Sequence, residues 1–189
     1  MLAGAILLGI LGLLTGAVWL LPGPRGRDAA LMLRLNTAEG PAAVDRCLAL
    51  TRVFGTTPLF LLALAAVAAL QPGRALGLVV AALAAEGLTK GVKIVARRAR
   101  PFEQDGRVVL RLARRPVDAA FPSGDAMRAG FLAVVAWAVV PAMGWLAATL
   151  AVIVGLGRVR AGVHYPLDVW AGWCLGVGAS LAWLGWMAR

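Results

Sequence analysis

Long apolar runs are the feature that most constrains how this chain can fold. The run from Leu2 to Leu21 carries no charge, and about 20 such residues cross the hydrocarbon core of a bilayer. Further runs follow at 53–70, 75–96, 122–140, 145–156 and 169–187. The chain is 61% hydrophobic with a mean hydropathy of +0.82, well above soluble domains. We predict an all-α bundle of six transmembrane helices, in one membrane domain covering residues 1–189.

The segments between the runs complete this prediction. Pro22-Gly23-Pro24 ends the first run, and residues 25–52 form short interfacial helices. Residues 97–121 form a long basic loop between the third and fourth spans. The first run has no basic flank or cleavage site, so we interpret it as an uncleaved span rather than a signal peptide. Cys47 and Cys174 are interpreted as packing residues. Glycines four residues apart allow close helix contacts, at Gly12/Gly16, Gly87/Gly91 and Gly172/Gly176.

The distribution of positive charge predicts an orientation. With six spans, one side of the membrane holds only Arg74 and Arg189 of the 19 Lys and Arg residues. The positive-inside rule then places the long loops on the cytoplasmic side and both termini opposite. We predict the plasma (inner) membrane of a bacterium. The net charge of +10 is interleaved with apolar spans, so we assign it to the bilayer surface or to anionic substrates rather than to nucleic acid.

His164 is the single histidine of the chain, and it lies on the predicted cytoplasmic side. Asp168 follows it by four residues and Arg158 precedes it by six. Placing an imidazole, a carboxylate and a guanidinium beside apolar membrane spans costs free energy. We therefore expect these residues to have a catalytic or binding role.

Two other polar stretches lie at span ends on the same side. One runs from Lys93 to Arg100-Pro101, and the other is Pro122-Ser123-Gly124-Asp125. With the His164 stretch, they resemble in order and spacing the three motifs of the type 2 phosphatidic acid phosphatase (PAP2) superfamily of integral-membrane lipid phosphatases. The resemblance implies six helices and a phosphatase acting on a lipid phosphate or diphosphate through a phosphohistidine.

The residue types fit phosphoryl transfer, which needs charge neutralisation and a positioned nucleophile. Arg100 and Arg158 can each fork onto a phosphate, and Lys93 adds a point charge. Ser123 and Gly124 open a helix whose free N–H groups attract anions. We predict His164 as the nucleophile and Asp168 as the group that orients it. No metal and no cofactor is called for.

The chain departs from the family pattern at two positions. Gly157 stands where the family has serine, and Asp125 stands where it has the histidine implied to protonate the leaving group. Asp125 is the substitute acid in one interpretation. A lipid diphosphate needs less protonation than a monophosphate, because it expels a phosphate monoester whose second pKa is about 6. We therefore expect an isoprenoid or polyprenyl diphosphate. The alternative is an inactive relative that binds lipid phosphates or acts as a scaffold.

Overall fold

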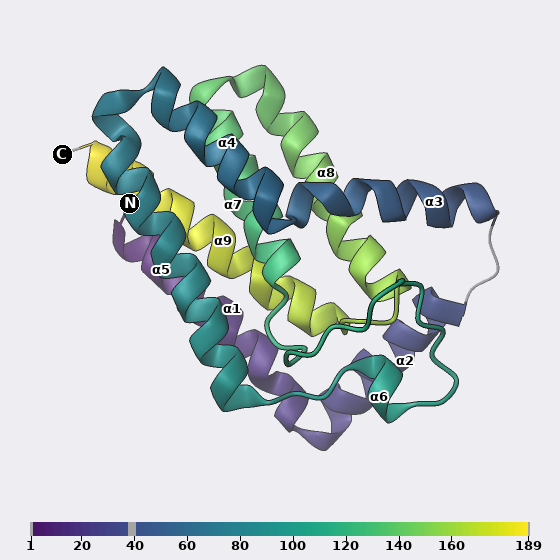
Figure 1. The fold of residues 1–189 in the computed structure, drawn as a ribbon. Helices are drawn as coiled ribbons and strands as arrows, with labels where there is room; N and C mark the ends of the chain where they lie inside the picture. Colours follow the sequence, from purple (N-terminus) through teal and green to yellow (C-terminus); the bar gives the residue numbers. More distant parts are fainter. Residues whose placement is uncertain (1, 38–40, 189) are drawn as a thin grey trace.

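The computed structural model describes residues 2–37 and 41–188, and helices are the only regular elements within these ranges (Figure 1). They are α1 (Leu2–Gly16), α2 (Pro22–Thr37), α3 (Ala42–Thr51), α4 (Thr57–Leu70), α5 (Pro72–Ala96), α6 (Pro101–Gln104), α7 (Gly124–Val139), α8 (Pro141–Arg160) and α9 (Pro166–Met187), with short 3-10 helices η1 (Ala17–Leu20) and η2 (Arg52–Gly55). The all-α prediction is therefore confirmed for the described residues. Arg189, used above to predict the orientation, lies outside them.

Prolines set where several helices begin. Pro72, Pro141 and Pro166 are each the first residue of a helix, where the missing N–H breaks no hydrogen bond. Helix α9 thus begins three residues before the apolar run predicted at 169–187. The runs predicted at 122–140 and 145–156 leave residues 141–144 for a turn, and this position is wrong, because the chain reverses at the extended Val140 and α8 starts at Pro141.

Helix α9 packs against α1, α5 and α7, and glycines permit two of these approaches. A Cβ on Gly176 would lie 2.0 Å from the carbonyl oxygen of Met127 in α7, and one on Gly12 would lie 2.0 Å from Cys174 Cβ. The predicted close contacts of those glycine pairs are confirmed. The prediction for Gly87 and Gly91 is wrong, because both face open space.

The apolar core lies where α4, α5, α7 and α9 meet. Phe60 and Phe131 pack edge to face with ring centroids 5.5 Å apart, and Leu78 and Trp183 close the same cluster. These side chains are essentially inaccessible to the surroundings. They hold the helix ends that carry the polar residues in a fixed relation.

Within the described residues 2–37 and 41–188, four helices are long and apolar enough to cross a membrane, and a bent pair counted as one span brings the number to five. The four are Leu2–Leu20, Pro72–Gln104, Pro141–Arg160 and Pro166–Met187, and the pair is Ala42–Gly55 with Thr57–Leu70, bent by 50°. Helix α7 has 16 residues and is the element missing from the predicted six. These apolar helices make the chain an integral membrane protein. The six-span count stays a prediction.

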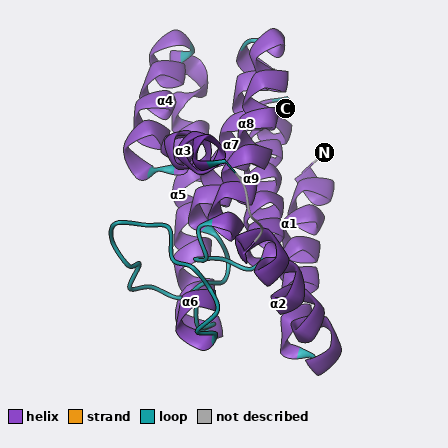
Figure 2. Cartoon of the chain, turned by 90° about the vertical axis from the view of Figure 1, so that its right-hand side faces the viewer, coloured by secondary structure: helices purple, strands orange, loops and turns teal. Residues whose placement is uncertain are grey.

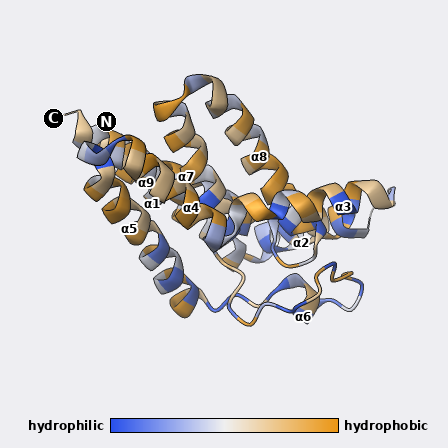
Figure 3. Cartoon of the chain, turned by 45° about the horizontal axis from the view of Figure 1, so that its top comes forward, coloured by the Kyte–Doolittle hydropathy of each residue, from blue (hydrophilic) through white to orange (hydrophobic). Residues whose placement is uncertain are grey.

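Polar and irregular segments gather at one end of the bundle. Figure 2 shows the long loop, α6 and α2 together there, while the α4–α5 and α7–α8 turns lie at the other end. In Figure 3 hydrophilic residues mark the second half of α5 and the loop around α6, whereas α8 is mostly hydrophobic. This arrangement agrees with the charge asymmetry read from the sequence, although which end faces the cytoplasm stays a prediction.

Candidate active site

The three polar stretches meet at the polar end of the bundle. Backbone hydrogen bonds join them: the Ala120 N–H donates to the Arg98 carbonyl (2.8 Å), and the Ser123 N–H donates to the Asp168 carbonyl (2.9 Å). They enclose a cavity of about 190 Å³. Its walls are Arg52, Glu86, Thr89, Lys90, Lys93, Arg100, Pro116, Asp118, Gly124, Asp125, Arg128, Arg158 and His164.

His164 is buried against the wall of this cavity, and its hydrogen bonds define its tautomer. Nδ1 lies 2.8 Å from the carbonyl oxygen of Ala120. A carbonyl only accepts, so Nδ1 carries the proton and donates it. Nε2 then keeps its lone pair, and Arg100 Nη1 approaches it at 3.5 Å. An imidazole in this state can attack an electrophile through Nε2.

The surroundings keep the imidazole neutral. Burial lowers the pKa of His164 well below 6.5, and the charges of Arg100, Arg158 and Lys93 lower it further. Gly162 makes the buried position possible, since its φ of +76° turns the chain back sharply between α8 and His164. The predicted nucleophile is thus both uncharged and held in one orientation.

Asp168 does not orient His164 in the predicted way. Its Oδ2 lies 3.7 Å from His164 Nδ1, beyond hydrogen-bonding distance, and accepts instead from the Tyr165 N–H at 2.8 Å. Its Oδ1 accepts from Arg98 at 2.7 Å. The tautomer is fixed by the Ala120 carbonyl, because the α9 cap and Arg98 use both oxygens of Asp168.

Arg98 is the centre of a buried ion cluster that sequence reasoning missed. Besides Asp168, it donates to Asp28 of α2 at 2.6 Å, and it stacks on the rings of Tyr165 (4.0 Å) and Trp19 (4.7 Å). Asp28 also accepts from the Leu167 N–H at 3.1 Å. The cluster joins α2 to the start of α9 directly behind His164.

Lys93 and Arg100 lie together as predicted, and a third residue joins them. Asp118 accepts from Lys93 at 2.8 Å and from Arg100 at 2.6 Å. Arg100 is also held by the carbonyls of Asp118 and Val163, both at 2.8 Å. Although burial raises it, the hydrogen bond and charge of Lys93, with the charge of Arg100, bring the pKa of Asp118 to about 2. Asp118 is therefore an anion in contact with both cations.

Ser123 and Gly124 form the predicted start of α7. Ser123 is the N-cap residue, and its hydroxyl accepts from the Ala126 N–H at 3.4 Å. A Cβ on Gly124 would meet only the guanidinium of Arg128, at 3.6 Å. The N-terminus of α7 is thus open toward the cavity, which favours negative charge there.

Asp125 lies between two arginines. Oδ2 is 3.1 Å from Arg158 Nε and Oδ1 is 3.3 Å from Arg128 Nη1. The Arg158 contact is an ion pair with poor hydrogen-bond alignment, since that nitrogen has no hydrogen-bond partner among the described residues. Arg128 also donates to Glu86 through Nε and Nη2, and to the Gly55 carbonyl through Nη1. This geometry suits a carboxylate better than a proton donor.

Helix packing explains why residue 157 is glycine rather than the serine of the family motif. A Cβ there would lie 3.3 Å from the carbonyl oxygen of Leu48, because α3 crosses α8 at this point. A serine would press against that backbone, so glycine allows the crossing.

Three residues of the site were not predicted from the sequence: Arg98, Asp118 and Asp28. The first two lie in or next to a predicted motif, whereas Asp28 does not. Arg98 lies within the first motif, but a run of arginines at a span end is ordinarily solvent-facing. Asp118 precedes the second motif by four residues. Asp28 lies in a segment of mixed polar and apolar residues, and its contact with Arg98 is visible only in the folded structure. Within residues 2–37 and 41–188, no group of His, Cys, Asp and Glu side chains has metal-ligand geometry.

A helical membrane bundle with a cavity lined by several Lys and Arg side chains at one end is the class of protein that this fold and site define. The chain belongs to the PAP2 superfamily, whose family model matches residues 74–189. That range holds every predicted site residue. The solved structure of a transmembrane PAP2-type phosphatidylglycerolphosphate phosphatase from Bacillus subtilis superposes with a TM-score of 0.79 at 20% identity, covering 97% of this chain and 96% of that one. Aquifex aeolicus LpxE superposes with a TM-score of 0.73 at 23% identity, covering 82% and 93%.

Two curated relatives match over shorter stretches. One is an undecaprenyl-diphosphatase from Sulfolobus acidocaldarius, 41% identical over 78 residues that cover 41% of this chain and 37% of the relative. The other is the bacitracin transport permease protein BcrC from Bacillus licheniformis, 38% identical over 73 residues that cover 39% and 36%. The matched stretches span little more than a third of these relatives.

Proposed function

We propose that this chain is a metal-independent lipid phosphate phosphatase that acts on an isoprenoid or polyprenyl diphosphate through a phosphohistidine at His164. The observation that carries the proposal is the hydrogen bond from His164 Nδ1 to the Ala120 carbonyl. It leaves Nε2 unprotonated, with a lone pair that accepts a long hydrogen bond from Arg100 (3.5 Å). A phosphate that draws Arg100 away would free this lone pair for attack, beside Lys93, Arg100 and Arg158 as the cations that neutralise the phosphate. Asp168 supports the helix start behind His164.

A lipid tail has a place beside this cavity. An apolar cavity of about 290 Å³ lies between α4, α7 and α8. Phe54 at one wall follows Arg52 of the polar cavity by two residues, and Ala129 lies one helical turn after Asp125. A substrate with a charged head and a long apolar chain fits two neighbouring cavities of opposite character.

The test is a phosphate-release panel in detergent, with farnesyl diphosphate and longer polyprenyl diphosphates against phosphatidic acid, with and without chelator. We expect release from the diphosphates, unchanged by chelator and absent in His164→Ala. A clear preference for phosphatidic acid would contradict the substrate assignment, and chelator sensitivity would contradict the histidine mechanism.

The ion pairs of Asp125 favour a second candidate, a silent lipid-phosphate-binding protein of the same fold. A carboxylate held by two arginines donates no proton. In that case the wild-type chain releases nothing from any lipid, His164→Ala changes nothing, and Asp125→His creates activity.

A further inference from the structure

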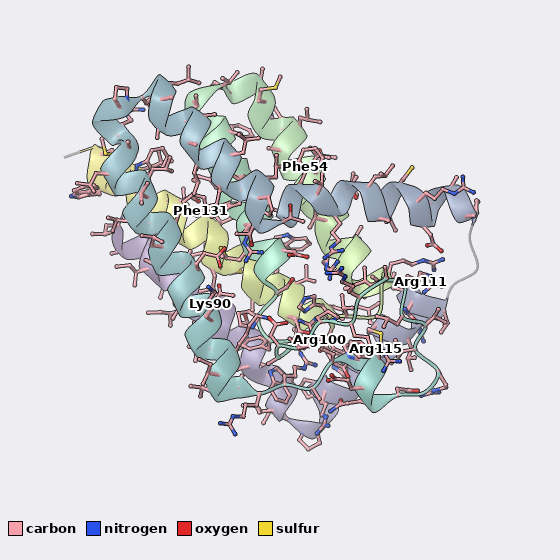
Figure 4. The ribbon with its side chains drawn as sticks, in the orientation of Figure 1. Phe54, Lys90, Arg100, Arg111, Arg115 and Phe131 are labelled. Atoms are coloured by element: carbon pink, nitrogen blue, oxygen red, sulfur yellow. The ribbon has the colours of Figure 1, made fainter. Side chains whose placement is uncertain are left out.

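The cavity beside His164 extends past the residues that the three motifs supply. Its far wall holds Arg52 of η2 and Thr89 and Lys90 of α5. In Figure 4 Lys90 lies on α5, above the level of Arg100 in the loop that follows. None of these three residues belongs to a motif, and the mechanism above uses none of them.

The cations supplied by the motifs have carboxylate partners, whereas Arg52 and Lys90 of the far wall have none among the described residues. Lys93 and Arg100 pair with Asp118, and Arg158 pairs with Asp125. Among the residues that the structure describes, Arg52 and Lys90 face the cavity with no carboxylate in ion-pair range. Glu86, the acid of α5 that lines the same cavity, pairs with Arg128 instead, so Arg52 and Lys90 carry positive charge that no described carboxylate pairs with.

Thr89 gives an independent indication of a ligand. The residue is 2% exposed, and its hydroxyl has no hydrogen-bond partner within residues 2–37 and 41–188. A helical threonine ordinarily donates to a carbonyl of the preceding turn. An unpaired buried hydroxyl is destabilising because it has lost its hydrogen bond to water, and an acceptor in the cavity would restore that hydrogen bond. Glu86, Thr89 and Lys93 lie on one face of α5, so the Thr89 side chain is on the same side of the helix as that of Lys93.

We propose that Arg52, Thr89 and Lys90 bind the second phosphate of a diphosphate, the one that stays on the lipid after cleavage. The inference rests on the proposed function and adds the residues that select diphosphates over monophosphates. The Thr89 hydroxyl donates to a phosphate oxygen, and the two cations neutralise the charge that develops on the departing group.

The subsite explains how the leaving group can depart although the chain has no second histidine to protonate it. The bond from His164 Nε2 to the terminal phosphorus forms while the bond from that phosphorus to the bridging oxygen breaks. The electron pair leaves on the lipid phosphate, which becomes a dianion and needs no proton. Water then attacks the phosphohistidine, inorganic phosphate departs carrying the oxygen and protons of the water, and neutral His164 returns. A monophosphate would have to expel an alkoxide, which cations on this wall do not protonate.

The test compares the wild-type chain with Thr89→Val/Lys90→Gln on a prenyl diphosphate and on the matching prenyl monophosphate. We expect kcat/KM for the diphosphate to fall about 10- to 100-fold, the equivalent of lost hydrogen bonds to a charged group, with monophosphate turnover within about twofold. Arg97→Gln is the matched control, because Arg97 is an exposed cation near the same helix end whose side chain donates to the Ile94 carbonyl and does not line the cavity. An equal fall on both substrates, or no fall on the diphosphate, overturns the subsite.

A binding measurement separates the two proposals. We expect the wild-type chain to bind inorganic pyrophosphate more tightly than inorganic phosphate in calorimetry, and Thr89→Val/Lys90→Gln to abolish the difference. If the wild-type chain hydrolyses neither lipid but shows this difference, the proposed activity is wrong and the subsite stands. If both anions bind wild type and variant alike, the subsite is wrong whatever the activity.

Discussion

Replacing Arg98 by methionine tests the buried ion cluster behind His164. Arg98 is the cation that pairs with both Asp28 and Asp168, and all three side chains are at most 4% exposed. Methionine fills much of the same volume but leaves two buried carboxylates without a cation. Removing one partner of a buried pair costs about 3–5 kcal/mol. For a chain of this size, that corresponds to a loss of roughly 6–20 °C in Tm.

The assay is thermal unfolding in detergent, followed by circular dichroism. Arg97→Met is the control, because Arg97 is exposed and is the neighbouring arginine. Arg98→Met/Asp28→Asn should recover about half of the loss, since one orphaned carboxylate is removed. Burial already raises the pKa of Asp28, against the hydrogen bond and charge of Arg98. Without Arg98 the carboxylates bind protons more readily when folded, so the deficit should shrink as pH falls from 7 to 5. A change in Tm within about 2 °C for Arg98→Met would refute the reasoning.

Three further predictions concern the site and the packing. Because the pKa of His164 in the free protein lies well below 6.5, the His164 contribution to kcat/KM, which reports the free enzyme, should persist at pH 6 and fall only as pH passes below that lowered pKa; an acid limb centred at 6.5 or above would contradict it. Asp118→Asn removes an anion that competes with phosphate for Lys93 and Arg100, so inhibition by inorganic phosphate should strengthen roughly two- to fivefold, as for a half-exposed charge, and weaker inhibition would count against it. Gly176→Ala should destabilise the bundle by about 1–3 kcal/mol in thermal unfolding, because its Cβ meets the Met127 carbonyl, whereas Gly87→Ala, which faces open space, should not.

The sequence predicted the helical class and the gathering of the motifs, because both depend on local patterns. Each local pattern can be read within one short stretch of sequence. Examples are an apolar run of span length, a proline at a helix start, and the spacing of Lys93 to Arg100 or of His164 to Asp168. Four of the predicted phosphate-site residues, Lys93, Arg100, Gly124 and Arg158, line one cavity. Ser123 does not line it and is fully buried as the cap of α7. The PAP2 resemblance is confirmed by the family match over residues 74–189.

The partners of the site residues could not be predicted, because they come from distant segments and from the backbone. The carbonyl that fixes His164 belongs to Ala120, a residue with no polar side chain. Asp28 reaches Arg98 across 70 residues of sequence. Asp168 was assigned to His164 on sequence proximity, but a buried guanidinium competes better for its oxygens than a neutral imidazole does. The glycine spacing failed at Gly87, because four-residue spacing does not reveal which helix face meets a neighbour.

The most direct test of the account is the chemical position of a trapped phosphoryl group. Wild-type protein given a terminally labelled prenyl diphosphate and quenched with base should retain label at His164, on Nε2, because Nδ1 is committed to the Ala120 carbonyl. Mass spectrometry and phosphorus NMR of the labelled peptide identify the residue and the nitrogen, and His164→Ala should carry no label. Label on Nδ1, or steady phosphate release by His164→Ala, would contradict the account.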